Sequence, residues 1–272
     1  MKKKILFTDI DGTLLNDQKE LTPKTRNMID KLTQAGHYMV LASGRPIMSV
    51  MEVGEQLGIS KNNLFYIGSN GGIVVEAATG RTIMEKRLDM KSVEYIFKIC
   101  EEMGIHVHSY TDDAIVSKKQ SKELTFYQQT IHMPTLLVER VDDAFAEKPP
   151  LKCVAVSIDG REKLEKLKDV LTPWAEGKIT LLFSNDKLLE MFPCDSGKGK
   201  ALEWLSGYLD IPVVNTLAAG DQDNDISMIE AAGMGVAMCN GAEHVKEIAD
   251  QVTQQSNNED GLVPILEKFF RI

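Results

Sequence analysis

Two aspartates near the amino terminus, Asp9 and Asp11, are the first residues whose types and spacing could do chemistry. They follow the apolar run 5–8, whose continuity predicts a strand buried on both faces of a parallel sheet. Two carboxylates this close repel each other, and a hard divalent cation such as Mg²⁺ removes the conflict because oxygen ligands suit it. An aspartate beside such an ion can also attack phosphorus and form an aspartyl-phosphate. The Asp11-Gly12 pair alone is common turn chemistry, so this prediction needs partners elsewhere in the chain.

The segments around these aspartates predict an α/β fold, a Rossmann-like, doubly wound parallel sheet. Thr22-Pro23 is typical of a helix start, and the apolar run 38–42 after that helix completes a βαβ unit. Further apolar runs at 64–67 and 213–219 end in polar residues, as the earlier runs do. Ligands of such sheets bind at the carboxyl ends of the strands, so these polar residues are expected to gather at one edge.

Residues 85–188 interrupt the strand-helix alternation and predict an inserted α+β cap domain with an antiparallel sheet. The catalytic core is then expected to comprise residues 1–84 and 189–272. A cap of this kind would close over the core and contact the leaving group of a substrate. The polar candidates for that contact, which are equally well explained as exposed strand and helix positions, are His106, His108, Tyr110 and Lys118 to Lys122.

The residues at the strand ends complement one another for phosphoryl transfer, which needs positioning and charge neutralisation more than covalent chemistry. Asp9 is the candidate nucleophile and Asp11 the candidate general acid and base. Asp221 is the candidate third oxygen ligand of a Mg²⁺ site that also uses Asp9 and a backbone carbonyl near Asp11. The candidates for binding phosphate or substrate are Ser43, Gly44, Arg45, Asn70, Lys198 and Asn224. Each alone would be unremarkable in a turn or at a helix end, and it is their joint occurrence that favours the prediction.

Together these motifs resemble the Cof-type branch of the haloacid dehalogenase (HAD) superfamily, whose members carry a C2-type cap. The matching segments are Asp9-Ile10-Asp11-Gly12-Thr13-Leu14, Ser43-Gly44-Arg45-Pro46, Asn70-Gly71, Leu189-Glu190-Met191, Lys198-Gly199, 220–225, Val236-Ala237-Met238 with Asn240, and Glu259-Asp260-Gly261. The resemblance implies Mg²⁺-dependent hydrolysis of phosphate monoesters on small metabolites, often sugar phosphates. It implies that Asp225, with Asp9, Asp11 and Asp221, belongs to the metal site, and that a mobile cap is inserted after the third core strand.

Composition restricts the partners of the chain. Its formal net charge of -9 disfavours nucleic acid and anionic membranes. No window approaches the roughly 18 uncharged apolar residues that span a bilayer, and no signal-peptide pattern is present. The four cysteines are widely separated and form no Cys-x-x-Cys pair, which is typical of free thiols in a reducing cytoplasm. We therefore expect a cytoplasmic enzyme that acts on a small phosphorylated metabolite, with no obligate protein partner evident.

Other functions stay open at this point. A phosphotransferase or phosphomutase would use the same aspartyl-phosphate with a sugar hydroxyl in place of water, and a phosphatase could instead act on pyridoxal phosphate or flavin mononucleotide. Receiver modules of response regulators also cluster aspartates at strand ends, but they are much shorter and carry no cap-sized insert. A catalytically silent metabolite-binding protein is disfavoured because the full set of catalytic residues is present.

Overall fold

The computed structural model describes residues 2–129 and 131–272, and the chain divides into two compact units. The first unit comprises Met1–Met84 and Gly197–Ile272, and the second comprises Glu85–Ser196. The second boundary therefore falls at 196/197 and not at 188/189 as predicted. The reason is strand pairing: β11 (Leu188–Pro193) pairs antiparallel with two strands of the insert, β10 (Ile179–Asn185) and β9 (Cys153–Val156).

The first unit contains an eight-stranded sheet with the order β14-β13-β12-β1-β2-β3-β4-β5. Its strands are β1 (Ile5–Thr8), β2 (Tyr38–Ala42), β3 (Leu64–Gly68), β4 (Ile73–Glu76), β5 (Arg81–Glu85), β12 (Thr216–Gly220), β13 (Met234–Ala237) and β14 (Gln251–Val252). The six strands from β14 to β3 pair in parallel, and β4 then pairs antiparallel with β3. The predicted Rossmann-like fold is confirmed, with β1 near the middle of the sheet.

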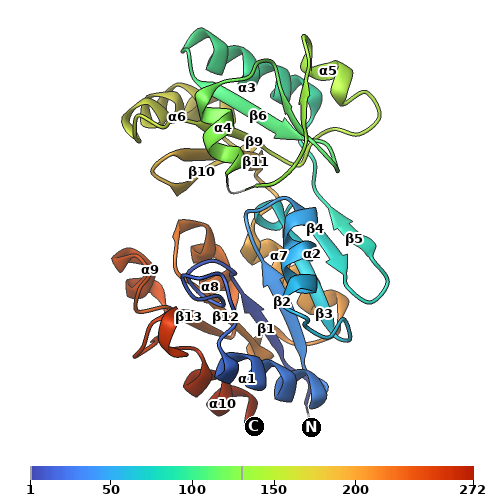
Figure 1. The fold of residues 1–272 in the computed structure, drawn as a ribbon, viewed down its shortest axis with the longest axis vertical. Coiled ribbons are helices and arrows are strands. Elements are labelled where there is room, and N and C mark those ends of the chain that lie inside the picture. Colours follow the sequence, from blue (N-terminus) through green and yellow to red (C-terminus); the bar gives the residue numbers. More distant parts are fainter. Residues whose placement is uncertain (1, 130) are drawn as a thin grey trace. The chain divides into compact units, whose positions relative to one another are not determined.

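Helices cover both faces of this sheet because its central strands are apolar on both sides (Figure 1). They are α1 (Pro23–Gln34), α2 (Ile47–Gln56), α7 (Lys198–Tyr208), α8 (Ile226–Ala231), α9 (Glu243–Ile248) and α10 (Val263–Phe270), with short 3₁₀ turns η1 (Ser69–Gly71), η2 (Val213–Asn215), η3 (Asp223–Asp225) and η4 (Asn257–Glu259). Ile5 and Phe7 pack in one cluster with Leu202 of α7, whereas Leu6 packs in the other with Leu32 of α1. This alternation fixes which residues of β1 face which helix layer.

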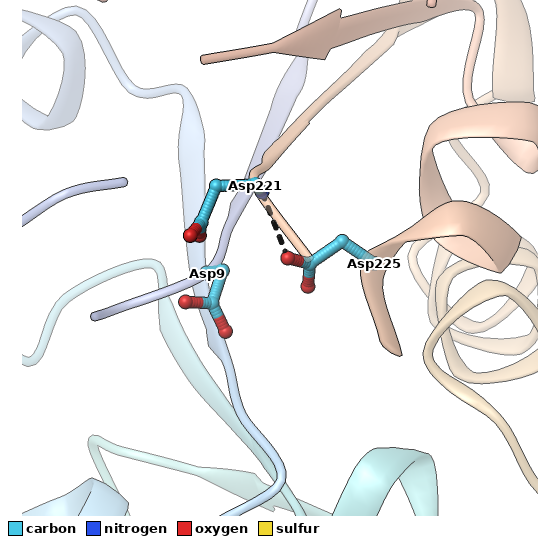
Figure 2. A group of neighbouring side chains, drawn as sticks. All are labelled: Asp9, Asp221 and Asp225. Atoms are coloured by element: carbon cyan, nitrogen blue, oxygen red, sulfur yellow. Dashed lines mark hydrogen bonds between the residues drawn. The ribbon is translucent and has the colours of Figure 1, made fainter. Parts of the chain in front are cut away.

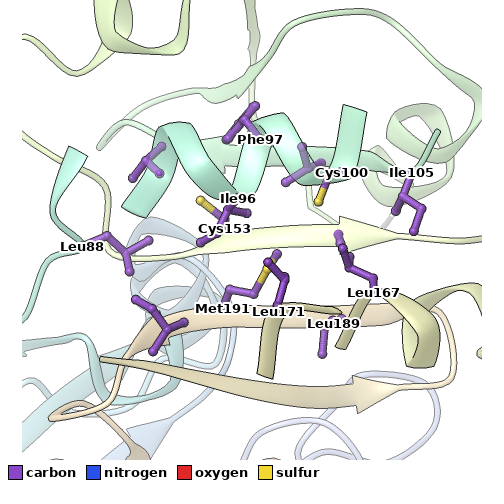
Figure 3. Packing of buried hydrophobic residues seen from close by; sticks show 14 of the residues in the cluster. Leu88, Ile96, Phe97, Cys100, Ile105, Cys153, Leu167, Leu171, Leu189 and Met191 are labelled. Carbon is purple, nitrogen blue, oxygen red and sulfur yellow. The ribbon is translucent and has the colours of Figure 1, made fainter. Parts of the chain in front are cut away.

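The second unit is the α+β insert, with the strand order β10-β11-β9-β6-β7-β8. The elements not yet introduced are α3 (Met90–Glu102), β6 (His106–Tyr110), β7 (Ile115–Ser117), α4 (Lys122–Gln128), β8 (Thr135–Leu137), α5 (Val141–Ala144) and α6 (Glu162–Ala175). On one face of the sheet α3 and α6 bury a large apolar cluster that includes Phe97, Cys100, Cys153 and Leu171 (Figure 3). On the other face α4 packs with Leu124 and other apolar residues over β6 and β9.

The described residues contain no helix that is long and apolar enough to cross a membrane. All four cysteines are free, and Cys100 and Cys153 are buried in the core of the second unit, where burial raises the pKa of the Cys153 thiol to about 12. Both buried thiols are therefore inert packing groups.

Candidate active site

Three aspartates of the first unit meet at the carboxyl ends of β1 and β12 (Figure 2). Asp9 directly follows β1, Asp221 directly follows β12, and Asp225 closes the turn η3. One oxygen from each lies within 4.8 Å of the others, and all three side chains are buried. The predicted gathering of carboxylates at one sheet edge is thus present in the structure, because neighbouring parallel strands end at the same edge.

Lys198, the first residue of α7, neutralises part of this charge. Its Nζ donates hydrogen bonds of 2.6 Å to Oδ1 of Asp9 and of 2.6 Å to Oδ1 of Asp225. Burial would lower the pKa of Lys198, but the two carboxylates outweigh it and the pKa of Lys198 is raised. The lysine is therefore a permanent cation, and its charge lies directly beside the candidate nucleophile.

One ammonium does not balance three carboxylates. Burial, followed by the charges of Asp225 and Asp221, raises the pKa of Asp9 well above its ordinary value although Lys198 opposes the rise. Burial and the charge of Asp225 likewise raise the pKa of Asp221 to about 6. A cluster of buried oxygen donors with surplus negative charge fits a hard divalent cation, which would remove the mutual repulsion.

Hydrogen bonds within the loop that carries Asp221 and Asp225 fix the shape of this loop. Oδ2 of Asp225 accepts hydrogen bonds from the backbone N–H groups of Asp221 (2.9 Å) and Gln222 (3.1 Å). A side chain at position 220 could not be accommodated, since a Cβ on Gly220 would lie 2.3 Å from Cβ of Asp225. Asp225 thus holds the loop in shape with one oxygen and leaves Oδ1 directed at Lys198.

The carboxylate of Asp11 lies outside this cluster of side chains, so the metal ligand expected at Asp11 stays a prediction that concerns the backbone carbonyl near it. The carboxylate accepts two hydrogen bonds of 2.9 Å from Nε and Nη2 of Arg45, and a third of 2.7 Å from Nζ of Lys19. Burial would raise the pKa of Asp11, but these two cations together hold it below its ordinary value. In this arrangement Asp11 is ionised, and the two cations oppose its protonation.

The predicted phosphate-binding residues come from the loops after β2 and β3, from α7 and from η3. Oγ of Ser43 accepts a hydrogen bond of 3.2 Å from the backbone N–H of Arg45, with Gly44 between them. Asn70 is buried with a left-handed backbone (φ 54°). The amide of Asn224 donates a 3.4 Å hydrogen bond to Oδ1 of Asn70, which ties the β3 loop to η3.

A close backbone contact sets the position of Lys198. Gly71 has a φ of +89°, and a Cβ there would lie 2.2 Å from the carbonyl oxygen of Gly197. Gly199, one residue into α7, similarly abuts the backbone of Ser227 in α8, and its N–H donates to Oγ of Ser227 at 3.1 Å. Glycine at 71 and 199 therefore lets α7 start close enough to β1 for Lys198 to reach Asp9.

Sequence reasoning assigned no role to several residues that shape the site. Thr13 donates a 2.8 Å hydrogen bond to Oδ1 of Asp221, and the amide of Asn240 donates at 2.8 Å to the carbonyl of Gly12. Lys19 pairs with Asp11. Thr13 and Asn240 are polar residues of the HAD-like motifs, and their place in these motifs is a signal in the sequence for such contacts. Lys19 carries no signal, because a lysine in a loop is ordinary.

A parallel α/β core with a buried carboxylate-lysine cluster at its strand ends and a separate α/β insert defines a HAD-type hydrolase. The family model described as haloacid dehalogenase-like hydrolase matches residues 6–266, and the chain belongs to this family. Phosphatase YwpJ of Bacillus subtilis is similar, with 28% identity over 97% of this chain and 99% of its own. The 5-amino-6-(5-phospho-D-ribitylamino)uracil phosphatase YwtE of the same organism is 27% identical over 97% of each chain.

Solved structures agree with this assignment. The crystal structure of a haloacid dehalogenase-like hydrolase from Bacteroides thetaiotaomicron matches with a TM-score of 0.86 and 28% identity, covering 98% of this chain and 99% of that one. The match extends over both units of the chain, so the resemblance inferred from the motifs is confirmed. The protein is a phosphatase of the HAD family.

Proposed function

We propose that this protein is a Mg²⁺-dependent phosphatase that hydrolyses small phosphorylated metabolites through an aspartyl-phosphate. The observation that carries the proposal is the contact between Asp9 and Lys198 inside a cluster of three buried aspartates. A nucleophilic carboxylate needs cations beside it to approach an anionic phosphate. Asp9, Asp221 and Asp225 would hold Mg²⁺, which when bound would neutralise charge on both carboxylate and phosphate.

The contacts of the described residues support the other roles that we propose. Asp9 attacks phosphorus through a carboxylate oxygen, the bond from phosphorus to the leaving alcohol breaks, and Lys198 balances the charge at Asp9. Asp11, ionised between Arg45 and Lys19, then takes a proton from the water that attacks the aspartyl-phosphate. Hydrolysis returns Asp9 as a carboxylate and releases inorganic phosphate. To protonate the leaving alcohol in the first step, Asp11 must itself be protonated and leave its pair with Arg45.

We further propose that the substrate carries its phosphate on a sugar or a sugar-derived chain. The resemblance to the Cof-type branch supports this class, as does the name of the relative YwtE, whose substrate is phosphorylated on a ribityl group. The net charge of -9 gives no long-range attraction for a phosphorylated molecule. The local cations Arg45, Lys19 and Lys198 would have to supply it.

The test is release of inorganic phosphate from a panel of sugar phosphates, nucleotides, pyridoxal phosphate and flavin mononucleotide, with Mg²⁺ and with EDTA. Mg²⁺-dependent release that is greatest for sugar phosphates supports the proposal. If release is greatest for pyridoxal phosphate or flavin mononucleotide, the proposed reaction stands and the proposed substrate class is wrong. Transfer of phosphate to a sugar hydroxyl without inorganic phosphate would show a phosphomutase or phosphotransferase in its place.

A further inference from the structure

The second unit contains a row of hydrogen-bonded polar side chains that the proposed reaction does not use. His106, His108 and Tyr110 alternate along β6, so all three project from the same face of the sheet. Both histidines are buried, His108 with no exposed surface, which differs from the exposed strand positions considered from the sequence. We call the row, with Ser121 and Tyr127 at its ends, the histidine ladder.

The contacts of the histidine ladder run without a gap from one end to the other. Oγ of Ser121 lies 3.0 Å from Nδ1 of His106, and Nε2 of His106 lies 3.3 Å from Nδ1 of His108. Nε2 of His108 lies 3.0 Å from the hydroxyl of Tyr110, which donates to the hydroxyl of Tyr127. All four imidazole nitrogens are therefore engaged. This suits two neutral rings, because a neutral imidazole offers one donor and one acceptor.

The ladder can hold few additional protons. If both histidines were protonated, the two ring N–H groups that meet over 3.3 Å would oppose each other as donors. The charged groups that face the rings also differ in sign. Lys152, which directly precedes β9, lies beside His108 but is ion-paired with Glu190 of β11. Lys119 lies near His106. Glu123 of α4 is the one carboxylate among the described residues that offsets charge at His106.

Helix α4 covers the side chains of the histidine ladder. Ser121 is its N-cap and accepts a 3.1 Å hydrogen bond from the N–H of Leu124. The ring of Tyr127, also in α4, lies 4.4 Å from the ring of His108 between centroids. Both ends of the ladder thus belong to α4 or its cap, while the histidines belong to β6. Separation of α4 from the sheet would break the contacts at both ends and give water access to the two rings.

We propose that the histidine ladder is a pH-sensitive lock that holds α4 on the sheet of the inserted unit. The docked helix keeps both histidines neutral, whereas the undocked helix lets them take protons from water at the ordinary pKa of a histidine. Burial lowers the pKa of His106 to about 4 and that of His108 well below its ordinary value of 6.5. Since the undocked state binds more protons, falling pH favours it.

The size of the effect follows from linkage. Between pH 7.5 and pH 5.5, a histidine that titrates near about 6.5 only when undocked raises the opening constant about tenfold, and two such histidines raise it about 100-fold. The readout is hydrogen-deuterium exchange of the α4 amides in the full-length protein, corrected for intrinsic exchange rates. We expect protection of α4 to fall by about 100-fold. Amides of α6, which covers the opposite face of the sheet, are the internal reference and should change far less.

Variants distinguish a pH-dependent effect of the two histidines from a contribution to stability that does not depend on pH. His106→Gln and His108→Gln each remove one titrating group and should reduce the pH-dependent change to about tenfold. Ser121→Ala removes a ladder contact without removing a titrating group, so it should speed exchange by the same factor at both pH values. His132→Gln, at an exposed position of the same unit, should leave the pH dependence intact.

A measurement on the unmodified protein tests the proposal even if the variants fail to fold. The carbon-13 shifts of the His106 and His108 rings should report neutral imidazoles at pH 5.5. Rings that titrate near about 6.5 in the folded protein would overturn the proposal. So would protection of α4 that does not change with pH, or an equal loss of protection in α4 and α6, which would place the pH dependence in the whole unit.

Discussion

Nζ of Lys198 lies 2.6 Å from Oδ1 of Asp9, although 189 positions separate the two residues in the sequence. The contact joins the first strand of the core to the helix that resumes the core after the insert. It is supported by the glycines that let α7 start against η1 and α8. The candidate active site therefore depends on the packing of the two segments of the first unit, 1–84 and 197–272, against each other. A change in either segment should affect activity and folding together.

Replacement of Lys198 tests this dependence. In Lys198→Met the buried carboxylates of Asp9 and Asp225 lose their cation, and loss of one partner of a buried ion pair costs about 3–5 kcal/mol. We expect a lower free energy of unfolding by that amount in urea, together with loss of phosphatase activity. Mg²⁺ should restore part of the stability. Lys200→Met, an exposed neighbour on the same helix, is the control. Equal stability and activity of the two variants would contradict this role for Lys198.

The nucleophile is tested by Asp9→Asn, which preserves size and removes the attacking oxygen anion. Turnover should fall by at least about 10³-fold, because the remaining groups cannot form the aspartyl-phosphate. The fold should survive, since the change also relieves repulsion with Asp221 and Asp225. Circular dichroism and thermal unfolding check the fold, and phosphate release checks activity. Activity within tenfold of the unmodified protein would remove Asp9 as nucleophile.

Asp11→Asn separates the two chemical steps. With an aryl phosphate, whose leaving group needs no proton, the first step should persist while attack by water slows by about 10²–10⁴-fold. One equivalent of phenol should then appear as a burst, and the aspartyl-phosphate should accumulate on the protein. Lys19→Gln, which keeps the two hydrogen bonds from Arg45 to Asp11, should slow turnover much less. A variant without a burst that turns over at the normal rate would show that Asp11 is not the base.

Much of the core and of the site could be predicted from the sequence because the information is local. Each apolar run ends at the same edge of a parallel sheet, so the polar residue after it is placed by topology alone. Asp9 and Asp221 illustrate this: β1 and β12 are neighbours, and the residues that follow them meet. A family resemblance in the motifs then added Asp225, whose position the apolar pattern did not determine.

Other features depend on pairing and on side-chain direction, which local patterns do not encode. The motif Leu189-Glu190-Met191 was assigned to the core by the sequence prediction. It lies in β11, which pairs with β9 and β10 of the insert, so the boundary was predicted eight residues early. The carboxylate of Asp11 forms hydrogen bonds with Arg45, a partner 34 positions away along the chain. His106 and His108 alternate like exposed strand positions, and their burial results from α4, whose packing on β6 involves contacts distant along the chain.

Binding of Mg²⁺ should depend on pH through the carboxylates of the cluster. In the metal-free protein the pKa of Asp221 is about 6, raised from its ordinary value of 3.8 by burial and by Asp225. Below pH 6 a proton therefore competes with the cation, and the apparent affinity should fall about tenfold per pH unit. A proton on Asp9, whose pKa is also raised well above its ordinary value, adds to this competition. Isothermal titration at pH 5, 6 and 7.5 measures this, and an affinity independent of pH would exclude Asp221 as a ligand.

The same pKa shift predicts the stability of the metal-free protein. The folded state retains a proton on Asp221 up to pH about 6, whereas the unfolded chain releases it near pH 3.8. Because the folded state binds more protons in this window, this group's contribution to stability is complete below pH 3.8 and is lost as pH rises to 6. Added Mg²⁺ should restore stability above pH 6. Urea unfolding with EDTA and with Mg²⁺ at both ends of the window checks the sign.

Gly71→Ala tests whether the backbone contact between η1 and α7 positions Lys198. The new Cβ would lie 2.2 Å from the carbonyl oxygen of Gly197 and would occupy a backbone with φ +89°, which alanine adopts only with strain. The clash should displace the start of α7, lowering the free energy of unfolding by about 2 kcal/mol or more and reducing kcat more than it raises KM. Gly207→Ala in the same helix is the matched control, because a Cβ there meets nothing within 4 Å and the helical backbone favours alanine by about 0.5–1 kcal/mol. If both variants turn over at the normal rate, the position of Lys198 does not depend on this contact.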